Sequence, residues 1–596
     1  MKTSTIFSPS GHPTFCVDGQ LLPACAYITY FDERNNYKDF AAGGIRLFSV
    51  TISFAAQPIN TTSGIMPHRR GVFDSKGKPD FSLVDETIGK ILEAVPDAYI
   101  FPRVFINMPE WWIAENPDDT TPVPRSKRRE SLYSDKFRAD AAQMLRELIA
   151  YCQIFPAKDH IFGYQLSGGN TQEWFHMDLN GSHCDESLLF FNAYLKKEYP
   201  HLYPAASLPS LTPVHDAAVI SDELLTAYLR FANEEIAETV DFFCKVAKEA
   251  CNREKIVGAF YGYTTEVCDP LWGTHAIGKL LESENIDFFS SPNSYMNNRA
   301  LGIDWGDMMP VNSIQLHGKL CFMECDIRTF LSRAPEDSRP GSDPDRFYRS
   351  DVWFGPPTEE LSVYAMRKSL ARQLTHKHGL WWFDMFGHWY ATEKLMNEAK
   401  TSVTLCRKAF ADRAYETKSE VAVFLDEKSL AYIGQKHPAY YSPYQLRTPL
   451  GAAGVPYDVF LIDDFVNIDW KNTPYKAVIF NIPHDAAYLA DYSARLGTLG
   501  IRSLAVSAQK PTYSTVELLR FFASSGVFIY CKSQDVFYIG NGFAGIHAAT
   551  SGLKIIQFPQ KVRCIDCESG ELTESDHLQL SLKKFETRLF QLETIR

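Results

Sequence analysis

The chain has 596 residues, 45% of them hydrophobic, and this length predicts roughly two to four domains with large buried cores. With 34 Gly, 33 Pro and 22% charged residues, the composition excludes a mostly disordered or collagen-like chain. The net charge of −12 argues against a nucleic-acid partner, because an acidic surface is repelled by phosphate groups.

The sequence also bears on compartment and metal binding. It has no apolar stretch of the about 18 residues that a membrane helix needs, and no apolar core near Met1 as in a signal peptide. We therefore expect a cytoplasmic protein without a membrane partner. The 13 Cys are scattered, which is typical of free thiols, and the lone CxxC of Cys564 and Cys567 lacks the second pair of a zinc site. The single basic run, residues 125–129, is expected to be a solvated loop.

Short β-rich runs alternate with helical stretches from residue 20 to about residue 415. Most of the runs are continuously apolar, which is typical of parallel strands buried on both faces. Eight strand–helix units in this length predict a (β/α)8 TIM barrel over residues 1–417. The predicted strands are residues 24–30, 45–53, 98–107, 161–168, 256–263, 286–291, 320–324 and 379–385.

Helices are predicted between these strands, including residues 135–152, 221–251 and 359–375. Another is expected to start at Ser82, where Ser-Leu-Val-Asp-Glu forms a capping pattern. The long segments 108–134, 178–218 and 326–357 follow the carboxyl ends of predicted strands. Barrel enzymes build their active sites from such segments.

Two further domains are predicted after the barrel. Residues 418–540 carry five predicted strands, at 421–425, 457–462, 477–480, 503–506 and 527–529, which favour a flavodoxin-like open sheet. No glycine-rich phosphate motif follows the first of them, so no cofactor is implied. Residues 541–596 alternate in short runs and predict a small antiparallel, β-sandwich-like domain.

Two carboxylates stand at predicted strand ends. Glu173 follows the fourth strand in Gly-Gly-Asn-Thr-Gln-Glu-Trp-Phe-His, and Glu324 ends the seventh in Leu-Cys-Phe-Met-Glu-Cys. In a barrel, side chains at the carboxyl ends of different strands look into one mouth. A retaining glycosidase needs a proton donor and a carboxylate nucleophile about 5–5.5 Å apart. The pair therefore predicts glycoside hydrolysis.

This pair of glutamates resembles glycoside hydrolase clan A, with its acid/base after strand four and its nucleophile after strand seven. The three-part layout resembles that of family 42 β-galactosidases and is similar to that of family 164 β-mannosidases. The resemblance implies that Glu173 is the acid/base, that Glu324 is the nucleophile, and that Tyr295 hydrogen-bonds the nucleophile. It also implies a homotrimer assembled through the domain at 418–540.

The sequence departs from the clan pattern at two places. Gln172 precedes the acid/base where the clan has Asn, which leaves Asn170 as an alternative contact for the sugar 2-hydroxyl. The clan arginine at the end of strand two has no counterpart, because Arg46 falls early in its run. Arg103 and Arg328 stay open as replacements.

Further candidate substrate-binding residues follow the predicted strands. For each Trp, a sugar platform and a packing role are equally open, and Asp384 is expected either to bind sugar hydroxyls or to make a structural ion pair. His176 is a further hydroxyl contact, and Asn293 follows the sixth strand. The tryptophans in question are Trp111, Trp112, Trp381 and Trp382.

We therefore expect a retaining, exo-acting β-glycosidase, β-galactosidase-like, that acts on small oligosaccharides or glycosides. The alternatives are a β-mannosidase of the same architecture, an inverting enzyme, and a barrel that binds glycans without cleaving them. Metal-dependent hydrolysis is not expected, because the HxH of His376 and His378 precedes the eighth strand, at the opposite end of the barrel from the mouth.

Overall fold

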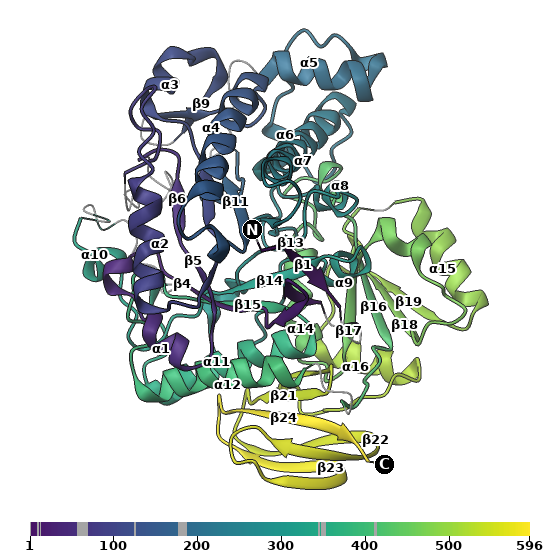
Figure 1. The fold of residues 1–596 in the computed structure, drawn as a ribbon. Helices are drawn as coiled ribbons and strands as arrows, with labels where there is room; N and C mark the ends of the chain where they lie inside the picture. Colours follow the sequence, from purple (N-terminus) through teal and green to yellow (C-terminus); the bar gives the residue numbers. More distant parts are fainter. Residues whose placement is uncertain are drawn as a thin grey trace.

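The computed structural model describes residues 2–8, 11, 13–56, 70–123, 127–176, 187–341, 343, 346, 353–409, 414–484 and 486–595. Its largest part is a barrel of parallel strands, followed along the chain by a parallel sheet and then by an antiparallel sheet (Figure 1). In Figure 1 the antiparallel sheet, in yellow, lies beneath the barrel and beside the parallel sheet. Within the ranges above, no helix is long and apolar enough to cross a membrane.

The barrel closes on itself. Its second strand is split into β5 and β6, and its third into β7 and β8, so the hydrogen-bonded order β6-β8-β11-β12-β13-β14-β15-β4-β5-β7 begins and ends on the same two strands. Each of the eight predicted runs contains one of these strands, which confirms the predicted TIM barrel. The strands are β4 (Cys25–Ile28), β5 (Leu47–Ser49), β6 (Thr51–Ser53), β7 (Tyr99–Ile100), β8 (Arg103–Ile106), β11 (Gly163–Gly168), β12 (Ile256–Ala259), β13 (Phe288–Phe289), β14 (Leu320–Cys325) and β15 (Gly379–Phe383).

One principal helix follows each barrel strand. The predicted helices at 135–152, 221–251 and 359–375 are confirmed to within two residues. Ser82 does begin a helix, but its hydroxyl donates to Asp80 instead of capping the backbone. The helices are α1 (Tyr37–Ala42), α2 (Ser82–Ala94), α4 (Asp135–Ile154), α7 (Glu223–Ala250), α8 (Ile277–Leu281), α9 (Val311–Leu316), α11 (Glu359–Thr375) and α12 (Glu393–Lys408).

Alternate side chains of each strand fill the barrel, because successive residues of a strand point to opposite faces. On β14, Phe322 points inward and packs edge-on against Phe288 and Trp381, with ring centroids 5.6 and 4.8 Å away. Glu324 lies two residues farther along and therefore shares this inward face, above Phe322.

A small N-terminal sheet closes the bottom of the barrel. It consists of β1 (Ser4–Phe7), β2 (Thr14–Val17) and β3 (Gln20–Leu22), none of which the sequence predicted. Phe15 is fully buried, and its ring packs edge-on against Phe162 and Phe322 from the barrel floor, at 4.9 and 5.1 Å.

Insertions lie at the opposite, carboxyl end of the strands. After β8, α3 (Glu110–Glu115) is followed by a hairpin of β9 (Thr120–Val123) and β10 (Lys127–Glu130). The expectation of a solvated loop at 125–129 is therefore wrong for the part at 127–129, where Arg129 is buried beside Phe105 and pairs with Glu130. Residues 125 and 126 lie outside the described ranges. The later insertions hold α5 (Ser187–Glu198), α6 (Thr212–Asp216) and α10 (Pro335–Ser338).

The second part is a flavodoxin-like parallel sheet in the order β17-β16-β18-β19. The expected fifth strand at 527–529 is wrong: Gly526 has a positive φ, and the N–H of Val527 donates to the Phe522 carbonyl, which closes the end of α16. The elements are β16 (Val421–Leu425), β17 (Tyr457–Leu461), β18 (Ala477–Phe480), β19 (Arg502–Ala505), α13 (Ser442–Gln445), α14 (Arg447–Gly451), α15 (Tyr488–Thr498) and α16 (Thr515–Ser524).

The third part is a five-stranded antiparallel sheet in the order β20-β21-β24-β22-β23. It begins with β20, before residue 541, and two of the expected short runs join into the single bulged strand β22. The strands are β20 (Val536–Gly540), β21 (Phe543–His547), β22 (Gly552–Asp566), β23 (Leu572–Leu582) and β24 (Thr587–Thr594).

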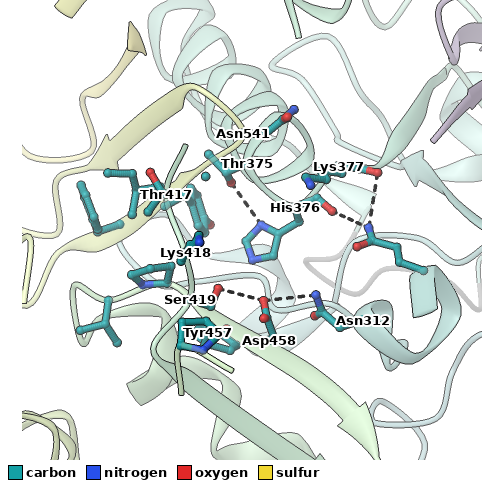
Figure 2. A pocket seen from close by; sticks show the side chains of 18 residues that line it. Asn312, Thr375, His376, Lys377, Thr417, Lys418, Ser419, Tyr457, Asp458 and Asn541 are labelled. Atoms are coloured by element: carbon teal, nitrogen blue, oxygen red, sulfur yellow. Dashed lines mark hydrogen bonds between the residues drawn. The ribbon is translucent and has the colours of Figure 1, made fainter. Parts of the chain in front are cut away.

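The three parts meet around a cavity of about 270 Å³ at the end of α11 (Figure 2). Its lining includes His376 and Lys377 from the barrel, Asp458 from β17 and Gly540 from β20. Asp458 is held there by hydrogen bonds from Asn312 and Ser419, at 3.2 and 2.9 Å. The predicted HxH thus begins in a junction between domains, on the turn that enters β15.

The antiparallel sheet also holds the barrel segment that follows β13. The N–H of Gly302 donates to His547 Nε2 at 2.8 Å, and the Tyr538 hydroxyl donates to Asp304 at 2.6 Å. Lys368 on α11 donates to the Ile303 carbonyl at 2.7 Å. The segment is therefore fastened to the C-terminal sheet on one side and to the barrel on the other.

Candidate active site

Glu324 is fixed at the mouth of the barrel by its own strand. Its N–H donates to the Ser291 carbonyl at 2.9 Å, and its carbonyl accepts from the N–H of Asn293 at 3.3 Å. Inward alternation along β14 then turns the carboxyl toward the barrel axis, where it is only 4% exposed.

Glu173 sits on a tightly folded loop after β11. Gly169, Gln172 and Trp174 have φ values of 71°, 73° and 64°, a region that is uncommon for a residue as bulky as Trp. The loop returns to its strand through a bridge between Gly168 and Glu173. Such backbone strain clusters at functional sites, because the surrounding structure must hold it in place.

The neighbours of Glu173 divide between packing and the mouth. Trp174, expected to desolvate Glu173, is fully buried and stacks on Phe243 of α7, with centroids 6.0 Å apart. Phe175 instead packs edge-on against Tyr263, 5.0 Å away. Only Phe175 therefore lies on the side of the residues that surround the glutamates.

Arg103 is the arginine that contacts Glu324. Its Nη1 donates to Glu324 Oε2 at 3.3 Å, its guanidinium lies 4.0 Å from the Phe260 ring centroid, and it is 1% exposed. This resolves the choice between Arg103 and Arg328 for the group that supports the expected nucleophile. Arg46 pairs with Asp97 at 2.6 Å, as its early place in the strand indicated.

The two carboxyls share an electrostatic environment. Burial raises the pKa of Glu173 to about 7, and the charge of Arg103 opposes this shift. Burial likewise raises the pKa of Glu324 to about 7; Arg103 opposes the rise, and the negative charge of Glu173 adds to it. Two carboxyls that disfavour each other's ionisation tend to hold one proton between them near neutral pH. The pair can therefore supply one acid and one carboxylate.

Tyr295 does not take its expected place. Its hydroxyl donates its single proton to Asp326 Oδ2 at 3.1 Å, so it does not donate to Glu324 in this structure. Asp326 also pairs with Arg299 at 3.0 Å and with Arg328. The tyrosine thus belongs to a charged cluster next to the mouth and acts on Glu324 only at a distance.

Asp384 is a structural residue. It is 0% exposed and accepts hydrogen bonds from Tyr27 at 2.8 Å, Asn36 at 3.1 Å and the N–H of Trp389 at 3.0 Å. The expectation that it binds sugar hydroxyls is therefore wrong, because its oxygens are already bonded and out of reach.

The predicted tryptophans pack the protein. Trp381 is fully buried inside the barrel against Phe322, and Trp382 faces outward, where its indole N–H donates to Ser402 at 3.2 Å. The indole N–H of Trp111 donates to the Phe73 carbonyl at 3.0 Å, and that of Trp112 donates to Asp140 at 2.7 Å. In this structure all four side chains have packing roles.

Three other candidates lie near the strand ends. The N–H of Asn170 donates to the Phe175 carbonyl at 2.8 Å, which holds it in the Glu173 loop. His176 follows on the same segment and rests 4.1 Å from the Tyr133 ring; burial lowers its pKa to about 3, so it is neutral. Asn293 accepts from Ser369 at 3.3 Å and lies behind Glu324.

Sequence reasoning missed Tyr30 and Tyr263. Their phenol groups are buried, and the charges of Glu173, Glu324 and Arg103 act on the pKa of both. They follow β4 and β12, on either side of the barrel, so the polar groups form a ring around the mouth. A tyrosine at the end of a predicted barrel strand was the available signal.

Solved structures show which proteins share this fold. No protein-family model matches the chain, and no curated protein matches its sequence at a significant level. A β-galactosidase from Bacillus circulans sp. alkalophilus has a TM-score of 0.61 at 12% identity, over 96% of this chain and 98% of that chain. A catalytic variant of Gan42B, a GH42 β-galactosidase from G. stearothermophilus, has a TM-score of 0.57 at 10% identity, over 96% and 98%.

A third solved structure of this fold carries a different activity in its name. It is an α-L-fucosidase isoenzyme from Paenibacillus thiaminolyticus, with a TM-score of 0.54 at 11% identity over 96% of this chain and 100% of that chain. Identities this low concern the fold alone. The chain resembles the family 42 β-galactosidases of clan A along nearly its whole length, in its barrel and in the two sheets that follow it.

Proposed function

We propose that the chain is a retaining, exo-acting β-glycosidase that removes terminal β-linked sugars from small oligosaccharides or glycosides, with β-galactosides preferred. One observation carries this proposal: Glu173 and Glu324, 151 positions apart in the chain, both have pKa values raised to about 7 and both feel the charge of Arg103. Paired acidic groups with perturbed pKa values at a barrel mouth are the arrangement that glycoside hydrolysis requires.

The proposed reaction has two steps. Glu324 attacks the anomeric carbon as the bond to the leaving oxygen breaks, and Glu173 donates its proton to that oxygen. The product of this step is a glycosyl ester on Glu324. Glu173 then takes a proton from water, which attacks the same carbon and releases the sugar with its original configuration.

The charges around the pair suit this sequence. Arg103 bonds to Glu324 and favours its ionised form, which the first step needs. While Glu324 is ionised, its charge disfavours ionisation of Glu173 and keeps the acid protonated. Once the ester forms, that negative charge is gone, so Glu173 loses its proton more readily and can act as the base.

A panel of nitrophenyl β-glycosides tests the activity, and proton NMR of the first-formed sugar tests its stereochemistry. We expect release of nitrophenol from the β-galactoside, with the β-anomer formed first. First formation of the α-anomer would show inversion and exclude Glu324 as a nucleophile. Sugar binding without turnover of any glycoside would favour the non-catalytic alternative.

The same panel addresses the sugar. The fold is shared with a protein named an α-L-fucosidase, so architecture alone does not select the glycone. Selection among β-galactoside, β-mannoside and β-glucoside depends on individual hydroxyl contacts. We keep the β-mannosidase as the second candidate, and a kcat/KM at least tenfold higher on the β-mannoside would replace the first.

We also propose that the flavodoxin-like domain assembles the chain into a homotrimer. The proposal is supported by the resemblance in layout and by apolar side chains that this domain exposes, including Val466 and Val516. Sedimentation equilibrium on the full chain tests it. We expect about three times the 67.6 kDa chain mass, and a monomer at assay concentration would overturn the proposal.

A further inference from the structure

A second cavity lies beside the strand end that carries Glu324. Its volume is about 480 Å³, and it is formed by segments that follow β13 and β14 together with a loop of the C-terminal sheet. The side chains that matter here are Arg299, Trp305, Arg328, Phe354 and Phe585. Among the described residues that line it there is no Asp or Glu.

Arg328 is the central group of this cavity. It is 5% exposed, and its guanidinium lies between two indole rings, 5.0 Å from Trp353 and 4.7 Å from Trp389. Nη1 faces Asp326, whereas Nε is buried and has no hydrogen-bond partner among the residues that the structure describes. A buried charged donor without a partner costs stability unless a ligand satisfies it.

The charges of the cluster do not balance. Asp326 is the one carboxylate that both Arg299 and Arg328 contact. Arg299 is already bonded through Nε to the Ser294 carbonyl at 3.3 Å and through Nη2 to the Asn293 carbonyl at 2.8 Å.

The other two charges at the mouth pair with each other, Arg103 with Glu324. The cluster therefore keeps one excess positive charge. Arg328 is the member with a donor to spare.

Aromatic side chains complete the cavity. Phe354 is 48% exposed although it is a large apolar residue. Phe585 has a φ of 70°, which is an outlier for a bulky residue and points to a functional constraint at this loop. Exposed aromatic faces beside a charged donor suit a sugar ring, whose C–H face is apolar and whose substituents are polar.

We propose that this cavity binds an acidic sugar unit, with Arg328 contacting a sulfate ester or a uronate carboxylate and Phe354 contacting the ring. The cavity lies on the Glu324 side of the mouth, and Arg328 is near enough to Glu324 to lower the pKa of its carboxyl. The substrates would then include oligosaccharides that carry an anionic unit. This link to substrates rests on the proposed glycosidase activity, whereas the binding of an acidic sugar does not.

Calorimetric titration of the full chain at low salt tests the proposal. The probes are galactose 6-sulfate, galacturonate, methyl β-galactoside and inorganic sulfate. We expect the two acidic sugars to bind about tenfold more tightly than the neutral one, with a preference that falls as salt is added. Equal affinities for acidic and neutral sugars would overturn the proposal, and so would inorganic sulfate binding as tightly as the sulfated sugar.

Variants separate the cavity from general charge effects. Arg328→Gln should remove the preference for acidic sugars, and Arg495→Gln, on exposed α15, is the matched control that should retain it. Because Arg328 is buried, Phe354→Asp provides a second test at an exposed position, where the new carboxylate should repel the anion. A preference that survives both Arg328→Gln and Phe354→Asp would refute the site.

The two proposals can fail independently. Hydrolysis of nitrophenyl β-galactoside without any preference for acidic sugars would sink the cavity proposal and leave the glycosidase intact. Preferential binding of acidic sugars without turnover of any glycoside would uphold the cavity and remove the glycosidase.

Discussion

Arg103→Met tests how the mouth controls its protons. The change removes a charge that is 3.3 Å from Glu324 Oε2 and keeps an apolar side chain against Phe260. A hydrogen bond to a charged group is worth about 1.5–3 kcal/mol, and 1.36 kcal/mol corresponds to one pKa unit, so the shift is about 1–2 units. Because Arg103 lowers the pKa of both carboxyls, its loss raises both.

The sign of the effect on activity follows from the two roles. The nucleophile must be ionised, so a higher pKa of Glu324 moves the acid limb of the kcat/KM profile upward and lowers activity below pH 7. The acid must be protonated, so a higher pKa of Glu173 moves the alkaline limb upward as well. The assay is kcat/KM for nitrophenyl β-galactoside between pH 4 and 10, with Arg46→Met as the exposed control. Limbs that stay in place or move downward would refute the reasoning.

Other changes address single residues. Glu324→Gln should abolish turnover of the nitrophenyl β-galactoside, and activity near wild type would remove Glu324 as nucleophile. Glu173→Gln should slow substrates with poor leaving groups by about 10²–10⁴-fold and activated ones much less; an equal loss on both kinds would argue against general acid catalysis. Tyr295→Phe should leave the acid limb in place, since its hydroxyl bonds to Asp326; a shift like that of Arg103→Met would show direct action on Glu324. Phe15→Ala should cost about 3–5 kcal/mol and lower the urea midpoint of barrel unfolding, and an unchanged midpoint would contradict its role as the floor.

The barrel was predictable because its strands carry a strong local signal. Runs such as 320–324 and 379–385 are apolar at every or nearly every position, as a strand buried on both faces must be, and each is followed by a long segment. Glu173 and Glu324 were predictable for the same reason, since a carboxyl at the end of such a strand breaks the apolar pattern.

The remaining site residues depend on register and packing, which the sequence does not display. Trp381 and Trp382 are adjacent, yet one fills the barrel and the other faces α12. Asp384 follows the same strand, but partners from distant segments occupy its carboxyl. The choice of Arg103 over Arg328 likewise depends on which strands are neighbours. The strands β1–β3 are only three or four residues long, so they carry little periodic signal.

The fastening of the segment after β13 bears on how this chain can be taken apart. Because His547 and Tyr538 grip Gly302 and Asp304, the C-terminal sheet acts as a splint for a stretch that leads back from the catalytic end of the barrel. A truncated chain that stops at residue 417 would free that stretch at one side. The appended sheets are therefore not modules to be trimmed at will, and swapping them between relatives should retune the barrel they are attached to.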